Sequence, residues 1–120
     1  MRTPLIAGNW KMYKTVSEAV EFTGRLKEIL GSPAGVEVAV CPPFTALFAV
    51  ARELAGTNIA LGAQNMHWEK EGAYTGEVSP AMLKEAGCRY VILGHSERRQ
   101  YFGETDRTVN KKLKAALAHG

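Results

Sequence analysis

The sequence predicts an α/β fold in which parallel strands alternate with outer helices in a single domain of 120 residues. Three observations lead to this prediction. Short apolar runs of strand length alternate with longer segments whose apolar residues recur at helical spacing. The pair of segments repeats at intervals of about 30 residues, the length of one βαβ unit. Four such units follow one another, and each closes on a glycine: Gly31, Gly56, Gly87 or Gly120.

The first unit joins a strand to the most clearly marked helix of the chain. Residues 4–10, PLIAGNW, have the apolar character of a strand. A helix is expected over residues 15–31, because Thr15 and Glu18 have the spacing of a capping box and the closing glycine suits a helix end. The apolar side of this helix comprises Val16, Val20, Phe22, Leu26 and Ile29.

The other three units repeat this order. Their expected strands are residues 36–40 (VEVAV), 58–63 (NIALGA) and 88–94 (CRYVILG). The helices expected to follow them are residues 46–56, 79–87 and 105–120. In the third unit Ser79 has a capping side chain and Pro80 suits the first helical position. Strands that alternate with helices in this way indicate βαβ crossovers and therefore a parallel sheet.

Composition and charge exclude several classes of protein. Apolar residues make up 46% of the chain and charged residues 22%, as in globular domains. No apolar run approaches the roughly 18 residues of a membrane span, and the apolar N-terminal patch is too short for a signal peptide. Two cysteines, Cys41 and Cys88, are too few for a disulfide framework, so reduced thiols in the cytoplasm are expected.

The positive charges of the chain are dispersed. The net charge is +3, and no basic stripe interleaved with aromatic residues is present, so a nucleic-acid partner is not expected. A mild positive excess suits a small anionic substrate.

Polar residues follow the end of each expected strand. They are Asn9 and Lys11, then Cys41 with two prolines, then Gln64 and Asn65, and finally His95, Ser96 and Glu97. Parallel α/β folds bind ligands at the carboxyl ends of their strands, so we expect these four groups to converge. The connection over residues 65–79 is about 15 residues long, whereas such loops usually take about 2 to 6, so it is expected to have a role of its own.

Asn9 and Lys11 are two residues apart. An extended backbone would point both side chains to one side, so that an amide and an ammonium face the same cavity. The alternative is a strand end that is merely solvated.

His95 follows four residues that are expected to be buried, and it opens a short helical stretch, SERRQYF. An imidazole at a helix N-terminus meets the positive end of the helix dipole, which favours the neutral ring as a hydrogen-bond donor. The alternative is a structural or capping histidine. Ser96 and Glu97 beside it could form a relay, or Glu97 could form surface ion pairs with the two arginines that follow.

Three specific kinds of functional site do not fit the sequence. GHSER begins like a nucleophile elbow, but Arg98 stands where the strained turn needs glycine. GNWKM lacks the second glycine and the hydroxyl residue of a phosphate-binding loop. His67, His95 and His119 are too scattered for a zinc signature.

Taken together, AGNWKM, CPPFTAL, LGAQNM, GAYTGE and ILGHSERRQYFGE resemble the triosephosphate isomerase family, in its order and approximate spacing. The resemblance covers essentially all 120 residues. It implies that the four units are the first (βα)4 half of a (βα)8 TIM barrel. It also implies an isomerase of glycolysis and gluconeogenesis that interconverts dihydroxyacetone phosphate and glyceraldehyde 3-phosphate through an enediolate, without metal or organic cofactor.

The same resemblance implies roles for individual residues. Asn9 and Lys11 would contact the substrate, and His95 would hydrogen-bond its carbonyl as a neutral imidazole, a familiar feature of this family. Glu97 would have a supporting catalytic role. The long loop would interdigitate with the second subunit of a homodimer. The interface residues implied in this way are Gln64, Thr75, Glu77 and Arg98.

The chain also departs from the family. A complete barrel takes roughly 250 residues, and this chain holds 120. The carboxylate base, the lid and the glycine-rich phosphate site of the family have no counterpart in it, so the chain alone is expected to be inactive. Open sheet edges promote association, so we expect pairing with the missing half or with a second copy. A non-catalytic self-assembling half-barrel is the alternative, and a different barrel enzyme acting on phosphorylated sugars is a third.

Overall fold

The computed structural model describes residues 2–120 and contains one parallel sheet of four strands. The strands, in the order in which they lie side by side, are β1 (Leu5–Asn9), β2 (Glu37–Cys41), β3 (Ile59–Ala63) and β4 (Cys88–Val91). Each neighbouring pair is parallel, with Val38 opposite Ile6 on one side and opposite Ile59 on the other. The predicted parallel α/β fold is therefore confirmed.

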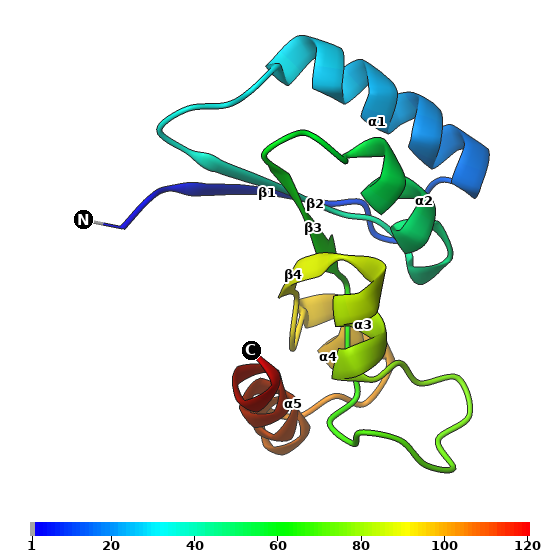
Figure 1. The fold of residues 1–120 in the computed structure, drawn as a ribbon. Helices are drawn as coiled ribbons and strands as arrows, with labels where there is room; N and C mark the ends of the chain where they lie inside the picture. Colours follow the sequence, from blue (N-terminus) through cyan, green and yellow to red (C-terminus); the bar gives the residue numbers. More distant parts are fainter. Residues whose placement is uncertain (1) are drawn as a thin grey trace.

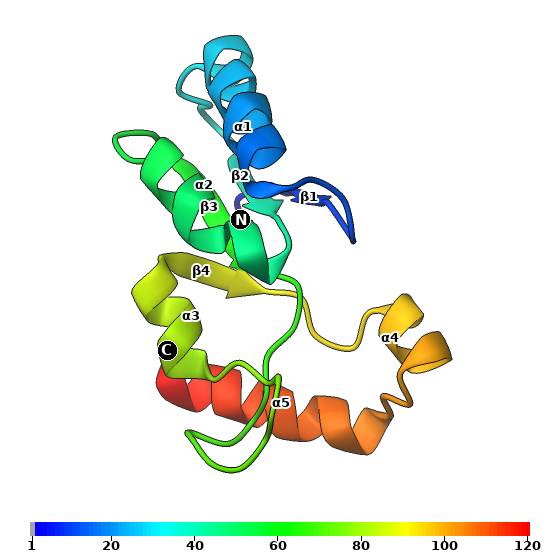
Figure 2. The same ribbon diagram turned by 90° about the vertical axis from the view of Figure 1, so that its right-hand side faces the viewer.

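Helices follow each strand and lie around the outside of the sheet. The longer ones are α1 (Val16–Leu30), α2 (Leu47–Glu53), α3 (Pro80–Ala86) and α5 (Asp106–His119), while α4 (Ser96–Tyr101) is short and a 3₁₀ turn, η1 (Phe44–Ala46), precedes α2. Figure 1 shows the order of these elements, and Figure 2 shows α1, α2, α3 and α5 along an arc with the strands on its inner side. None of the helices formed by residues 2–120 is long and apolar enough to cross a membrane.

Local signals set most helix ends where the sequence predicts them. The Thr15 hydroxyl accepts the Glu18 N–H at 3.4 Å, and the Glu18 carboxylate accepts the Thr15 N–H at 3.0 Å, so the capping box is present. Ser79 caps α3, which ends at Gly87 with φ of 106°. This left-handed conformation favours glycine because it has no Cβ.

The second helix is shorter than predicted. Its α-helical part ends at Glu53 rather than at residue 56. The amide and the hydroxyl of Thr57 both donate to the Leu54 carbonyl, at 3.0 and 2.7 Å, and this turn ends the helix.

The core lies between the sheet and the helices. β3 is buried along its whole length, and the main core cluster comprises Ala19, Val40, Ala46, Leu47, Val50, Leu54, Ile59, Leu61, Ala63, Met66 and Leu83. The side predicted to be buried on α1 is wrong. Of its five residues only Val20 and Leu26 are half-buried, and Ile29 is 78% exposed, whereas the fully buried residues of this helix are Ala19 and Thr23. α1 contacts α2, and the small buried side chains of Ala19 and Thr23 allow the two helices to approach closely. Phe22 and Leu26 border an apolar cavity of about 410 Å³ beside β1.

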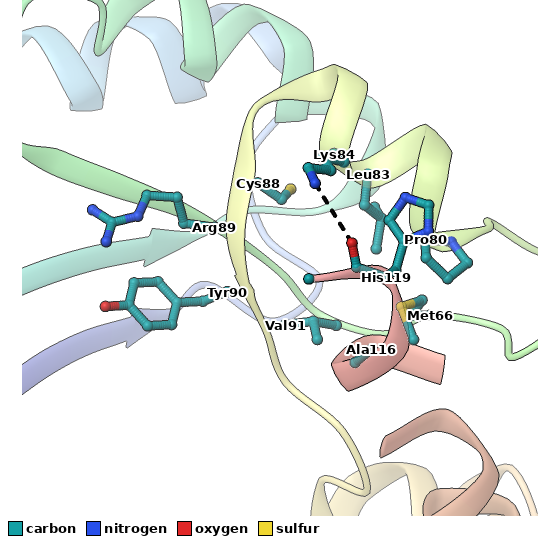
Figure 3. A pocket seen from close by; sticks show the side chains of 11 residues that line it. Met66, Pro80, Leu83, Lys84, Cys88, Arg89, Tyr90, Val91, Ala116 and His119 are labelled. Carbon is teal, nitrogen blue, oxygen red and sulfur yellow. Dashed lines mark hydrogen bonds between the residues drawn. The ribbon is translucent and has the colours of Figure 1, made fainter. Parts of the chain in front are cut away.

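The outer edges of the sheet are open in the part of the chain that the structure describes. There β1 pairs with β2 and β4 pairs with β3. A small cavity of about 110 Å³ lies beside β4, and Lys84 Nζ donates to the His119 carbonyl there at 3.5 Å. Figure 3 shows the side chains that line it. In the same view Arg89 and Tyr90 extend away from α3 and α5. Unpaired strand edges of this kind promote association with further strands.

Both cysteines are free thiols. Cys41 is buried, and burial raises the pKa of its thiol. Burial, with a smaller contribution from Cys41, raises the pKa of Cys88 to about 11. Neither thiol is poised to react as a thiolate near neutral pH.

Candidate active site

A cavity of about 270 Å³ lies at the carboxyl ends of the strands. Its lining includes Asn9, Lys11, Gln64, Asn65, His95 and Glu97, together with Met12, Phe44, Arg98 and Phe102. These residues come from three of the four polar groups singled out in the sequence. The fourth group takes part through its backbone, because the Cys41 carbonyl accepts a hydrogen bond from Gln64 Nε2 at 2.8 Å. The structure thus brings the predicted groups together at one end of the sheet.

Asn9 and Lys11 reach this cavity in a different way from the one predicted. The expectation of an extended backbone is wrong at Lys11, whose φ of 55° is left-handed. The Asn9 side-chain oxygen accepts the Lys11 N–H at 2.9 Å, and Gln64 Nε2 donates to the Lys11 carbonyl at 2.9 Å. These two hydrogen bonds hold a conformation that is uncommon for lysine.

Lys11 and Glu97 form the ion pair of the cavity, with 2.6 Å between Nζ and Oε1. Their hydrogen bond is the main cause that raises the pKa of Lys11 and lowers the pKa of Glu97. The cavity therefore holds a fixed ammonium and an ionised carboxylate. The two arginines that follow Glu97 pair with Glu104 and Asp106 instead. The alternative, in which Glu97 forms surface ion pairs with these arginines, is therefore wrong.

His95 is the N-cap residue of α4 and also lines the cavity. Its Nδ1 accepts the backbone N–H of Glu97 at 3.1 Å. A ring nitrogen that accepts a hydrogen bond carries no proton, so the proton of the neutral ring is on Nε2. His95 can therefore cap α4 and take part in the site at the same time. Its Nδ1 accepts a backbone N–H of the helix, and its Nε2–H remains for a ligand.

Gly94 fixes the path of the chain into His95. Its φ is 65°, and its carbonyl accepts a hydrogen bond from Arg99 Nε at 2.9 Å. A Cβ at this position would lie only 2.8 Å from Val109 Cγ2, so the backbone packs against α5 where no side chain fits. Glycine is required here by both conformation and space.

Replacing Gly94 by alanine should destabilise the chain by more than the about 1–2 kcal/mol that a left-handed L-residue costs, because the new methyl also meets Val109. The measurement is urea-induced unfolding followed by circular dichroism. Gly103→Ala is the matched control, because Gly103 has a similar φ of 68° and nothing within 4 Å of a Cβ. Equal losses in the two variants would contradict a steric role for Val109.

Glu104 holds together a buried polar network behind the cavity that sequence reasoning missed. Its side chain is 3% exposed, and its Oε1 accepts the Gly94 N–H at 3.1 Å. Its Oε2 accepts from Arg98 Nε at 2.8 Å and from Lys112 Nζ at 3.1 Å. Lys112 Nζ also donates to Asn65 Oδ1 at 2.9 Å. Glu104 ends the segment ILGHSERRQYFGE, but no local pattern reveals that its carboxylate is buried.

Stability should fall in acid partly through Glu104. Burial alone would raise its pKa, but hydrogen bonds from Arg98 and Lys112 outweigh burial and hold the pKa below its ordinary value of 4.5. A carboxyl whose pKa is lower in the folded state stabilises the fold above the unfolded-state pKa and loses this effect as pH falls through the folded-state pKa. The difference in free energy of unfolding between the wild type and Glu104→Gln should therefore be largest near neutral pH. Urea titrations at several pH values check that it shrinks below about 4.5.

The long connection after β3 forms a projecting loop (Figure 1). The His67 N–H donates to the Val78 carbonyl at 2.9 Å, and the His67 ring lies 4.2 Å from that of Trp68 and 4.6 Å from that of Tyr74. Thr75 is exposed in this loop, as is Glu77, whose Oε1 lies 3.6 Å from His67 Nδ1.

Of the residues expected at a subunit interface, Arg98 and Gln64 form side-chain hydrogen bonds within this chain. Arg98 bonds to Glu104, and Gln64 bonds to the Lys11 and Cys41 carbonyls. Interface roles for Gln64, Thr75, Glu77 and Arg98 stay predictions. Across residues 2–120, no three His, Cys, Asp or Glu side chains are grouped so that they could hold a metal ion.

Comparisons with known proteins match almost the whole chain. The family model for triosephosphate isomerase matches residues 4–120. Over its whole length the chain is 66% identical to the triosephosphate isomerase of Carboxydothermus hydrogenoformans and 64% identical to that of Chloroflexus aurantiacus. The crystal structure of triosephosphate isomerase from Bartonella henselae superposes with a TM-score of 0.89 and 43% identity over 99% of this chain.

The matches also show how much of these relatives the chain represents. It spans 48% of the length of each of the two curated relatives and 49% of the solved structure. Its four parallel strands and their helices correspond to part of a TIM barrel. On the fold, the family match and the sequence identity together, the chain belongs to the triosephosphate isomerase family.

Proposed function

We propose that this chain supplies the N-terminal half of the active site of a triosephosphate isomerase, which interconverts dihydroxyacetone phosphate and glyceraldehyde 3-phosphate through an enediolate. The observation that supports the proposal best is the shared cavity of His95, Lys11 and Asn9. It combines an imidazole whose Nδ1 accepts the Glu97 N–H, an ammonium and an amide within one small volume. A phosphorylated triose has a carbonyl oxygen that can be polarised and a negatively charged phosphate. The imidazole and the amide can donate hydrogen bonds to the oxygen, and the ammonium can neutralise negative charge.

The chemistry assigned to these residues is electrophilic. When a base takes a proton from the carbon beside the carbonyl, the electron pair of the C–H bond moves to form the enediolate, and negative charge develops on oxygen. His95 Nε2–H and the Lys11 ammonium stabilise that charge as fixed donors in the cavity. Protonation of the neighbouring carbon then gives the isomer. Glu97 supports the reaction by keeping Lys11 charged and in place through its 2.6 Å ion pair.

The remaining parts of the reaction are assigned outside these 120 residues. The general base, the lid and the glycine-rich phosphate site of the family have no counterpart here, and a positioned base alone contributes about 10² to 10⁴ in rate. We therefore expect no measurable isomerisation by the chain alone. We further propose a cytoplasmic location and a homodimer in which residues 65–79 interdigitate with the second subunit. In it Thr75 lies towards the partner subunit's Asn9 and Lys11, Glu77 and Arg98 form an ion pair at the interface, and Gln64 belongs to the same interface.

Co-expression tests this function. The chain is produced together with the C-terminal half of the Carboxydothermus hydrogenoformans relative, which is 66% identical to it over the 120 residues that the two share. Interconversion of the two triose phosphates is expected from the assembled pair and from neither part alone. A pair that folds as one species but shows no isomerisation would rule the function out.

A second candidate is a non-catalytic half-barrel that pairs with its own copy. The open outer edges of β1 and β4 and the apolar cavity of about 410 Å³ beside β1 favour it. Light scattering coupled to size-exclusion chromatography measures the mass in solution. A stable self-paired species that forms no active assembly with the C-terminal half would favour this candidate.

A further inference from the structure

Glu104 joins three segments that meet behind the proposed active site. It lies in the turn between α4 and α5, and its own backbone N–H donates to the Arg98 carbonyl at 3.3 Å. The donors to its carboxylate come from the residue before His95, from α4 and from α5. One buried side chain therefore fixes the positions of these three segments relative to one another.

The contact with Gly94 bears most directly on His95. The Gly94 N–H is held by Glu104 at 3.1 Å, and its carbonyl is held by Arg99 at 2.9 Å. Both polar groups of this residue are thus bonded, and its left-handed φ of 65° directs the chain into His95. A rotation at Gly94 would move the imidazole with it.

The contact between Glu104 and Arg98 holds the chain on the other side of His95, at the start of α4. His95 Nδ1 accepts the Glu97 N–H at 3.1 Å, so the orientation of the ring depends on the first turn of α4. Arg98 lies in that turn and bonds to Glu104 at 2.8 Å. Through Gly94 and Arg98, Glu104 holds the chain on both sides of His95.

A buried carboxylate is not needed merely to fill this turn. Taking charges out of water is costly, and apolar residues of similar volume often stabilise a fold equally well. What a carboxylate adds is a set of directional bonds, here to three donors from different segments. Such a network favours one arrangement of the segments over others.

We infer that Glu104, which does not line the cavity, is a positioning residue for His95: its carboxylate fixes Gly94 and the first turn of α4 so that His95 Nε2–H is held towards the substrate. The reaction served is the proposed isomerisation, so this part of the inference rests on the proposed function. The orientation of His95 can be tested without it.

The test compares Glu104→Gln with Lys112→Met. Both variants remove one charge from the buried network, so both should lower the unfolding midpoint. Only Glu104→Gln weakens the charged bonds to Gly94 and Arg98, whereas Lys112→Met leaves them in place. Hydrogen exchange of the Gly94 and Glu97 amides in the 120-residue chain reports how tightly the His95 segment is held.

Glu104→Gln should speed exchange of these two amides by about 10-fold or more, the factor provided by one hydrogen bond to a charged group, while amides of β3 keep their protection. Lys112→Met should leave both amides close to wild type. In the assembly with the C-terminal half, Glu104→Gln should lower kcat by about 10- to 100-fold with KM little changed, because a displaced catalytic group slows chemistry more than binding.

Equal exchange in the two variants, or a uniform increase at all amides, would overturn the inference. So would a raised KM with an unchanged kcat. If neither variant folds, the wild-type chain still decides: Gly94 N–H should be protected like the amides of β4, and exchange as fast as at Thr75 in the exposed loop would overturn the inference. An inactive wild-type assembly would count against the proposed function, while the exchange data would still decide whether Glu104 orients His95.

Discussion

Replacing His95 by glutamine in the assembled pair of halves should lower kcat by about 10²- to 10³-fold, the loss expected for one donor to a developing oxyanion. Glutamine also has an acceptor and a donor, but both lie at the end of its side chain, so its oxygen cannot take the place of Nδ1 towards the Glu97 N–H while its N–H takes the place of Nε2–H. The assay follows dihydroxyacetone phosphate and glyceraldehyde 3-phosphate in both directions. Because the donor acts mainly on the transition state, kcat and kcat/KM should fall together.

His119→Gln is the matched control for this variant. It makes the same substitution at the end of α5, beside the small cavity of Figure 3 and outside the proposed site. It should leave kcat within about twofold of wild type, as for a surface change remote from the chemistry. A His95→Gln assembly with nearly wild-type kcat would show that the role given to this imidazole is wrong.

Replacing Lys11 by methionine should lower kcat/KM by about 10²-fold, since a hydrogen bond to a charged group contributes about 1.5–3 kcal/mol. Methionine keeps the length of the side chain but removes the only lysine ammonium among the residues that line the cavity within residues 2–120. It also leaves Glu97 without its partner, so an unpaired carboxylate would repel an anionic substrate. Steady-state kinetics of the assembly measure the loss.

Lys14→Met separates this effect from a general change in charge. Lys14 lies over the ring of Phe22 at 4.4 Å, outside the cavity, and its removal lowers the net charge by the same amount. Only the Lys11 variant should lose catalysis. Similar losses in both variants would mean that overall charge, rather than an ammonium in the cavity, attracts the substrate.

Features that depend on residues close together in the sequence could be predicted from it. Thr15 and Glu18 form their capping box three residues apart, and Ser79 caps α3 directly before Pro80. The convergence of polar strand ends follows from parallel topology, because βα units bring every strand's carboxyl end to the same edge. That rule placed His95 near Lys11 without any knowledge of side-chain contacts.

Features that depend on distant residues could not be predicted in this way. The left-handed backbone of Lys11 is held in part by Gln64, which lies 53 residues away in the chain. The buried face of α1 is decided by its contact with α2, which favours Ala19 and Thr23 over larger apolar residues. The Glu104 network needs donors from three segments, and only the folded chain shows that they meet. The interface roles of the loop concern a second subunit, so they stay predictions.

The proposed function depends most on His95 as a neutral imidazole whose Nδ1 is held by α4 and whose Nε2–H is presented to the cavity. Nitrogen-15 NMR of the histidine side chains measures this directly, with the His95 signals assigned by their loss in His95→Gln. At neutral pH we expect an unprotonated Nδ1 and a protonated Nε2 for His95. A ring protonated at Nδ1, or one that exchanges freely between both forms, would contradict it.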